Sequence, residues 1–320
     1  MTYIDNRTAR LLSHRLRGFD RRDSTRLGLE HALIAGVRQV EFDIRFTRDG
    51  KPVAYHDPIF KADDGKWHYI NEWELSALCA QGAFWQLATL EEMCACFKTF
   101  QSPGTLLHLD VKAEGYESVV HEIITRFGLL SNVVLVSWLP TVLHRFNALS
   151  PHTRLCFSHL PLVPSLYAAA KTLSPIANHA PAAFRQLLRI IGPQILKEAS
   201  TLTLYFDDDG DPASWVEDNT GAHHNVCHVV PGPVRGAMLD LLRRVNGMIC
   251  VPVWFATQTL AQVYRSQDIQ IAVYSVNGDS LLRRVTAEIN PDIVYVDNAD
   301  FILRAIRVRQ QGRRPFEAVR

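Results

Sequence analysis

Short apolar runs alternate with longer amphipathic segments along most of this 320-residue chain. In the segment 24–36 apolar residues recur at helical spacing, and Asp23 or Ser24 can cap its start, so a helix is expected there. The run VRQVEFDIRF that follows at 37–46 is dense in β-branched and aromatic residues and predicts a strand. The same reasoning predicts strands at 51–57, 105–115 (which ends in a loop), 133–140, 153–160, 248–255, 269–277 and 292–298.

Strands that alternate with helices, and that contain near-continuous runs of Val and Ile, indicate a parallel sheet covered on both faces. Eight or so such units, closed into a TIM-type (β/α)8 barrel, need about 250 residues. The excess length falls between about 160 and 245, where the sequence is apolar at first and repeatedly interrupted by Pro. We interpret 160–245 as an insertion, a lid over the barrel mouth, within one domain that spans 1–320.

The composition is that of an ordinary globular protein, with 47% hydrophobic and 21% charged residues. The formal net charge is +1, and the only basic block is a short tail at 307–314, so no nucleic-acid partner is indicated. The sequence has no run of about 18 apolar residues, so stable membrane insertion is not expected. The N-terminus lacks the apolar region of a secretory signal. The six cysteines show no metal-binding spacing. Reduced thiols and a cytoplasmic location are expected, and the oligomeric state is left open.

A local cluster of histidines, HHNVCH, places His224 and His228 four residues apart. On a helix that spacing could bind zinc, but the VVPGP that follows is not typical of a helix. A loop with surface histidines is therefore expected here.

Two carboxylates point to a metal site. Glu41 and Asp43 stand two apart in an otherwise apolar strand, so their side chains share one face. Inside a barrel, two such carboxylates repel each other unless a cation lies between them. Taken alone, the pair is equally typical of a solvated acidic face on an edge strand.

The strand at 105–115 adds a third carboxylate. His108, Asp110 and Lys112 alternate with leucine and valine and share one face, and burying such a trio is costly unless its members are paired or bind a metal. With Glu41 and Asp43, Asp110 would complete a set of oxygen ligands that suits Mg²⁺ or Ca²⁺. His108 either supports this set or is an ordinary core histidine.

Two histidines end apolar segments. His14, followed by Arg15, closes the first apolar segment, and His56 closes the strand at 51–57. Barrel enzymes carry their sites at the C-terminal ends of the strands. Two imidazoles there can divide the roles of acid and base, and the guanidinium of Arg15 can bind phosphate oxygens.

Aromatic and amide side chains near later strand ends are candidates for substrate contact. Trp254, Tyr274 and Asn277, together with Trp138 and the insertion, are expected to set specificity at the barrel mouth. Trp and Tyr rings can stack on a sugar or a choline group. Ordinary core packing is the alternative for the aromatic residues.

The motifs in this order resemble those of the glycerophosphodiester phosphodiesterase family, within the PLC-like phosphodiesterase superfamily. They are HR at 14–15, AGVRQVEFDIRFTRDGKPVAYHD at 35–57, LDVK at 109–112, VSW at 136–138, AVYSVN at 272–277 and DIVYVDN at 292–298. The resemblance implies a TIM-type barrel that binds a divalent metal. It further implies that His14 and His56 are catalytic, that Glu41, Asp43 and Asp110 bind the metal, and that Arg15 and Lys112 meet the phosphate.

The chain also departs from the family pattern. Leu16 stands where the family usually has Gly after HR, which puts a close approach of the backbone to the phosphate in question. Asp110 stands where the family commonly has Glu, as in the sphingomyelinase D-like relatives, which close a cyclic phosphate. The long insertion is unlike a bacterial-type hydrolase, and the agrocinopine synthase branch resembles the chain too.

The expected function is therefore that of a metal-dependent phosphodiesterase acting on a small-molecule glycerophosphodiester or sugar phosphodiester. The alternatives are a synthase, transferase or cyclising lyase that uses the same site, and a non-catalytic barrel that binds a sugar phosphate.

Overall fold

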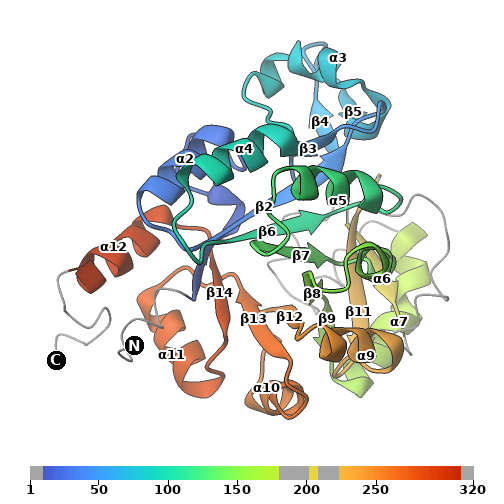
Figure 1. Cartoon of the computed structure of the whole chain (residues 1–320). Helices are drawn as coiled ribbons and strands as arrows, with labels where there is room; N and C mark the ends of the chain where they lie inside the picture. The colour runs from blue at the N-terminus through green and yellow to red at the C-terminus, as the bar shows by residue number, and fades with distance from the viewer. Residues whose placement is uncertain (1–9, 180–201, 208–222, 311–320) are drawn as a thin grey trace.

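Parallel strands form a closed barrel in the computed structural model, which describes residues 10–179, 202–207 and 223–310 (Figure 1). The barrel closes because the first strand pairs in parallel with both the last strand and the second. Within the described residues the eight barrel strands are β1 (Leu11–Ser13), β2 (Gln39–Phe46), β6 (Leu106–Val111), β7 (Val133–Ser137), β8 (Arg154–Ser158), β12 (Met248–Pro252), β13 (Gln270–Tyr274) and β14 (Ile293–Val296). The predicted TIM-type barrel is confirmed.

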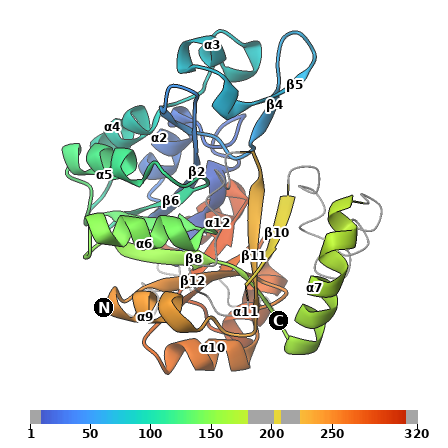
Figure 2. The ribbon, with the colours of Figure 1, turned by 90° about the vertical axis from the view of Figure 1, so that its right-hand side faces the viewer.

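Helices surround the barrel and bury their apolar faces against its strands (Figures 1 and 2). They are α2 (Arg26–Ile34), α4 (Leu90–Phe100), α5 (Glu117–Arg126), α6 (Pro140–Leu149), α9 (Gly236–Arg244), α10 (Gln258–Arg265), α11 (Asp279–Glu288) and α12 (Ala299–Gln310). The helix predicted at 24–36 is α2. Its cap is Thr25, whose hydroxyl accepts from the Gly28 N–H at 3.0 Å, and not Asp23 or Ser24.

The strand predicted at 51–57 does not belong to the barrel. It forms the short strand β3 (Pro52–Ala54), which pairs antiparallel with the end of β2. A connection as short as the TRDG turn returns the chain antiparallel, because a parallel partner needs a long crossover. The first barrel strand is instead β1, which has three residues and was too short to stand out in the sequence.

Residues 58–89 form a small unit that projects from one side of the barrel (Figure 1). Its apolar cluster includes Phe60, Ile70, Leu78 and Phe84. The unit consists of the hairpin β4 (Ile59–Lys61) and β5 (Trp67–Tyr69), the 3-10 helices η2 (Ile70–Glu72) and η3 (Gly82–Phe84), and α3 (Leu75–Cys79).

The described part of the insertion is a second, smaller sheet beside the barrel (Figure 2). Its strands β9 (Leu160–Leu162), β11 (Asn225–Pro231) and β10 (Leu202–Phe206) are parallel, and α7 (Pro164–His179) packs near them. Residues 180–201 and 208–222 of the insertion lie outside the described residues. The role of the insertion as a lid therefore stays a prediction.

The expectation of a loop with surface histidines is wrong for His228. This residue lies in β11, is 1% exposed, and its Nε2 is 2.9 Å from Asp207 Oδ2. Strand pairing on both sides of β11 buries side chains that a loop would have left in water. His224, just before the strand, is exposed.

All six cysteines are free thiols in the structure, as expected. None of the described helices combines the length and the apolar composition needed to cross a membrane. The second half of the basic tail at 307–314 lies outside the described residues.

His159, just after β8, makes the stability of the fold depend on pH. His159 Nδ1 donates to the Phe157 carbonyl oxygen at 3.4 Å, so Nε2 of the neutral ring accepts from the Tyr264 hydroxyl at 3.1 Å. Burial lowers the pKa of His159 to about 3, helped by the neighbouring His228 and opposed by the Phe157 carbonyl. Because an unfolded imidazole titrates near pH ~6.5, the folded state binds fewer protons below that pH. The stabilisation is complete above pH ~6.5 and is lost as the pH falls towards 3.

We therefore expect the free energy of unfolding to fall less steeply with acid in His159→Gln than in the wild type. The difference in slope should reach at most ~1.4 kcal/mol per pH unit between pH 6.5 and 3. Urea unfolding at pH 7.5, 6.5 and 5.5 measures both slopes, and the other buried histidines contribute equally to the two proteins. Equal slopes would show that His159 does not remain neutral in the fold.

Candidate active site

A cavity of about 340 Å³ opens at the C-terminal ends of the barrel strands. Its polar lining contains seven of the residues singled out in the sequence: His14, Arg15, Glu41, His56, Asp110, Lys112 and Asn277. Tyr274 and Trp138 also line it. Residues spread over more than 260 positions in sequence therefore meet in one place.

Three carboxylates form the centre of this site. Glu41 and Asp43 alternate along β2, and Asp110 stands opposite Asp43 in the parallel pairing with β6. One oxygen from each carboxylate lies within 4.8 Å of the others, and all three side chains are buried. Burial raises the pKa of Glu41, and the charges of Asp43 and Asp110 raise it further. A cation shared by the three would relieve both costs.

Two cationic side chains partly neutralise the carboxylates. Lys112 Nζ lies 2.9 Å from Asp43 Oδ1 and 2.5 Å from Asp110 Oδ2. Arg15 Nε lies 3.3 Å from Asp43 Oδ2. Burial by itself raises the pKa of Asp43, but Lys112, followed by His56 and Arg15, holds that pKa well below its usual range. Asp43 is therefore a carboxylate at neutral pH.

The donor set fits a divalent metal. Asp110 Oδ1 is buried and has no hydrogen-bond partner among the described residues. Glu41 receives the Arg15 N–H at 2.9 Å through Oε2. A ligand set made of three carboxylates suits hard cations such as Mg²⁺ or Ca²⁺. Glu41, Asp43 and Asp110 could hold such an ion.

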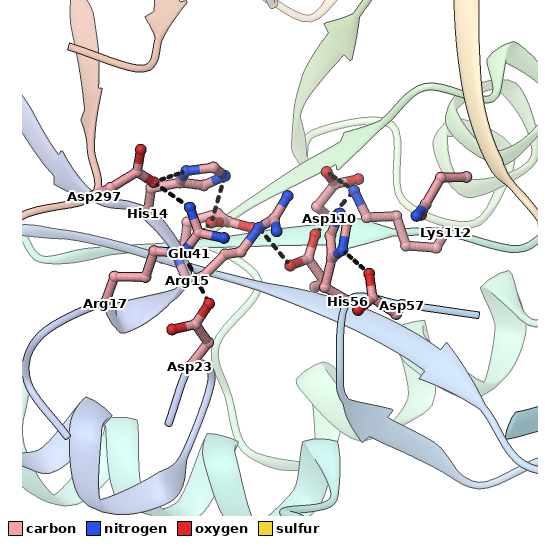
Figure 3. Close-up of polar contacts among 12 residues, drawn as sticks. His14, Arg15, Arg17, Asp23, Glu41, His56, Asp57, Asp110, Lys112 and Asp297 are labelled. Atoms are coloured by element: carbon pink, nitrogen blue, oxygen red, sulfur yellow. Dashed lines mark hydrogen bonds and ion pairs between the residues drawn. The ribbon is translucent and has the colours of Figure 1, made fainter. Parts of the chain in front are cut away.

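His14 lies in η1 (His14–Leu16), directly after β1, and is held by a carboxylate that the sequence analysis missed. Its Nδ1 is 2.6 Å from Asp297 Oδ1, at the end of β14, while its Nε2 is 3.9 Å from Glu41 Oε2 (Figure 3). Asn277 and Arg17 both donate to Asp297 at 2.8 Å. Burial raises the pKa of Asp297, but His14, Asn277 and Arg17 together hold that pKa well below its usual range. This network fixes the ring so that Nε2 faces the carboxylates.

His56 is oriented in a similar way. Its Nδ1 is 2.7 Å from Asp57 Oδ1, and its side chain is 11% exposed in the cavity. Figure 3 shows both imidazoles beside the carboxylate cluster. Each imidazole thus has its own carboxylate partner, which sets which ring nitrogen carries the proton.

Leu16, which stands where the family usually has Gly, does not prevent the backbone from coming close to the site. Arg15 and Leu16 both adopt left-handed conformations, with φ of 55° and 56°, the region where the family's Gly would be favoured. The Leu16 side chain is fully buried in the main core and does not line the cavity. The turn that presents the Arg15 N–H to Glu41 therefore forms without Gly, at the cost of backbone strain.

This strain predicts an unusual order of stabilities at position 16. Leu16→Ala should lower the free energy of unfolding by about 2–4 kcal/mol, because it leaves a cavity and keeps the strain. Leu16→Gly should be about 1 kcal/mol more stable than Leu16→Ala, because Gly accepts a positive φ freely. Urea unfolding of the three proteins measures the order. A Gly variant less stable than the Ala variant would contradict the strain.

Two other residues from the sequence analysis lie away from the cavity. Trp254 is 53% exposed, is not among the lining residues, and has the Arg284 guanidinium 5.4 Å above its ring. His108 Nε2 is 2.8 Å from Gln39 Oε1, and the ring faces a second cavity at the opposite mouth of the barrel. His108 is thus a core histidine, and burial lowers its pKa to about 3.

A protein-family model matches part of the chain in sequence, and solved structures match it in fold. The sequence model of the glycerophosphoryl diester phosphodiesterase family matches residues 14–157. This range contains both histidines, the three carboxylates, Arg15 and Lys112. No curated protein matches the chain.

Solved structures with a similar fold cover nearly the whole chain. The chain is 14% identical to a putative glycerophosphoryl diester phosphodiesterase from Silicibacter pomeroyi, with a TM-score of 0.61 and 94% and 93% of the two chains covered. It is 15% identical to a phosphodiesterase from Oleispira antarctica in complex with the product sn-glycerol-3-phosphate, with a TM-score of 0.59 and coverages of 93% and 96%. It is 18% identical to a glycerophosphodiester phosphodiesterase from Thermotoga maritima, with a TM-score of 0.55 and 95% and 98% of the two chains covered.

The sequence match falls on the half of the barrel that carries the carboxylates and both histidines. The fold likeness extends over nearly all of the chain and so includes much of the other half of the barrel. Residues 14–157 thus match the glycerophosphoryl diester phosphodiesterase family, whose members are phosphoric diester hydrolases, and the whole barrel has the fold of the structures named above.

Proposed function

We propose that this chain is a metal-dependent phosphodiesterase that hydrolyses a glycerophosphodiester or a sugar phosphodiester, with His14 and His56 as acid and base. One observation carries the proposal: a buried three-carboxylate cluster lies beside two imidazoles, each held by its own carboxylate. The Oleispira antarctica structure, with sn-glycerol-3-phosphate bound as product, supports the choice of a glycerophosphodiester.

The cationic side chains bind and orient the phosphodiester. Arg15 and Lys112 both reach the cavity, so their donors can meet the non-bridging oxygens of the phosphate. Burial lowers the pKa of Lys112, but Asp110 and Asp43 raise it more, so it remains an ammonium. A bound divalent ion, Mg²⁺ or Ca²⁺, would neutralise charge that builds on the phosphate oxygens.

Proton transfer falls to the histidines. One imidazole takes a proton from water as the water oxygen bonds to phosphorus, and the other gives a proton to the alkoxide as its bond to phosphorus breaks. The products are a phosphate monoester and a free alcohol. Asp297 and Asp57 hold the rings in the orientation and tautomer that each transfer needs. Each transfer contributes roughly 10²–10⁴ in rate.

Substrate recognition involves an aromatic wall of the cavity. Tyr274 and Trp138 line this wall, with their rings 6.2 Å apart and nearly perpendicular, and they can pack on the alcohol part of the substrate. Asn277 acts on the site through Asp297, and Trp254 contacts only substrates that extend to the rim. Leu202, Asn225, Val226 and Cys227 of the insertion line this cavity, which supports a role for the insertion at its mouth within a single domain.

Phosphorus NMR of the purified protein with sn-glycero-3-phosphocholine tests this function. With Mg²⁺ or Ca²⁺ we expect one new resonance, that of a phosphate monoester, and no turnover after exhaustive chelation. A cyclic phosphate would assign the chain to the cyclising lyases instead. A phosphodiester formed from two alcohols supplied together would assign it to the synthases. Turnover that survives chelation would contradict the metal.

A further inference from the structure

Arg45 is a buried charged residue that the mechanism above does not use. It follows Glu41 and Asp43 at the same two-residue spacing in β2, so the three side chains share one face of the strand. Arg45 is only 2% exposed, although it lies one residue past the last pairing of β2 with β6. Burying a guanidinium is costly unless its donors are satisfied.

The guanidinium of Arg45 joins two segments that are far apart in sequence. Its Nε donates to the backbone oxygen of His56 at 2.9 Å. One terminal nitrogen donates to the backbone oxygen of His224 at 3.2 Å, and the other donates to the side-chain oxygen of Asn225. A single planar group thus bonds both to His56, after β3, and to the residues at the start of strand β11.

Both of these segments form part of the active-site cavity. His56 supplies one of the two imidazoles, while Asn225, Val226 and Cys227 line the cavity from the insertion. Strand β11 pairs with β10 and β9 and with none of the described barrel strands. Its place beside the barrel therefore depends on side-chain contacts: Val226 and Val230 pack in the main core, and Arg45 bonds to the start of the strand.

The chemistry of arginine suits this position. The guanidinium presents donors in three fixed directions, so it can meet the oxygens of His56, His224 and Asn225 together. A lysine ammonium is a single point charge and cannot span the same three acceptors. The positive charge also lies near Asp57, the partner of His56, and adds to the groups that keep Asp57 ionised.

We propose that Arg45 is a positioning residue that sets His56 and the cavity wall formed by β11 in one geometry. The kinetic part of this proposal rests on the proposed function, because it takes His56 to be catalytic. A shift of about 1 Å in a reacting group can cost up to about 100-fold in rate. Losing Arg45 releases His56 and the insertion wall at once, so it affects both turnover and binding.

Kinetics of three variants test the proposal with sn-glycero-3-phosphocholine as substrate. Arg45→Lys and Arg45→Gln should lower kcat by about 10–100-fold and raise KM, at temperatures where both are fully folded by circular dichroism. Asn225→Ala removes the side-chain acceptor on the insertion and keeps the bond from Arg45 to His56. It should therefore raise KM and leave kcat within about twofold. The matched control is Arg48→Gln, an exposed arginine three positions away that pairs with Glu74 and should change neither constant. Unchanged kcat in folded Arg45→Gln would overturn the proposal.

Hydrogen–deuterium exchange gives a second readout that does not depend on activity. In Arg45→Lys, peptides covering 54–57 and 224–227 should both exchange faster than in the wild type, and Arg48→Gln should leave both unchanged. Faster exchange in only one segment, or in neither, would show that Arg45 does not join them. If the wild type hydrolyses no phosphodiester, the proposed function fails, and the exchange result alone then decides whether Arg45 joins the two segments.

Discussion

Replacing His14 or His56 by Asn should lower kcat by about 10²–10⁴-fold, because each variant loses one of the two proton transfers. Asn keeps a polar group of similar size in contact with Asp297 or Asp57, so the fold and KM should change little. Initial rates with sn-glycero-3-phosphocholine at saturating Mg²⁺ give kcat and KM for each variant.

The control for the histidine variants is His152→Asn, which changes an exposed histidine before β8 and should keep wild-type kcat. The double variant His14→Asn/His56→Asn should lose less activity than the product of the two single losses, because residues that act as a unit are not additive. A single variant that keeps kcat within threefold of the wild type would remove that histidine from the mechanism.

Glu41→Gln should weaken the binding of Mg²⁺ by at least about 100-fold and abolish turnover at millimolar Mg²⁺. The change removes one of three carboxylates while keeping an oxygen that can accept the Arg15 N–H. In the wild type, Mg²⁺ at 100 times its Kd should raise the free energy of unfolding by ~2.7 kcal/mol. Isothermal titration calorimetry measures the Kd, and thermal unfolding with and without Mg²⁺ measures the stabilisation.

Without metal, in the presence of a chelator, Glu41→Gln should be more stable than the wild type. Glu41 is buried beside two like charges, so the neutral amide should raise Tm above that of the wild type. The control Glu74→Gln changes an exposed carboxylate and should leave both the Kd and the metal-induced shift in Tm intact. Mg²⁺ binding that is unaffected by Glu41→Gln would place the ion elsewhere.

Much of the barrel could be predicted from the sequence because its signals are local. Parallel strands that are buried on both faces show as continuous apolar runs, and seven of the eight barrel strands were found in this way. β1 was not, because three residues carry too little pattern, and its pairing with β14 joins residues about 280 positions apart. The strand at 51–57 had the right pattern but the wrong partner, since the short turn before it decides its direction.

The site could be predicted where alternation places charges on one face of a strand. Glu41, Asp43, Asp110 and Lys112 were recognisable for that reason. Asp297 was missed because its partner His14 lies 283 positions away. Arg45 continues the alternation of Glu41 and Asp43, but its link to Asn225, 180 positions away, leaves no local signal. A carboxylate at the end of the last strand was the available signal for Asp297. Nothing local indicated that Trp254 would lie outside the cavity lining or that His228 would be buried.

A crystal structure of the protein grown with Mn²⁺ and sn-glycerol-3-phosphate tests the central claim most directly. We expect one anomalous peak at about 2.0–2.6 Å from oxygens of Glu41, Asp43 and Asp110, the range for divalent ions with oxygen ligands. The phosphate should lie against this ion and Arg15, with an imidazole nitrogen of His14 and of His56 within reach of its oxygens. A manganese ion or a phosphate bound elsewhere, with the carboxylate cluster unchanged, would contradict the account.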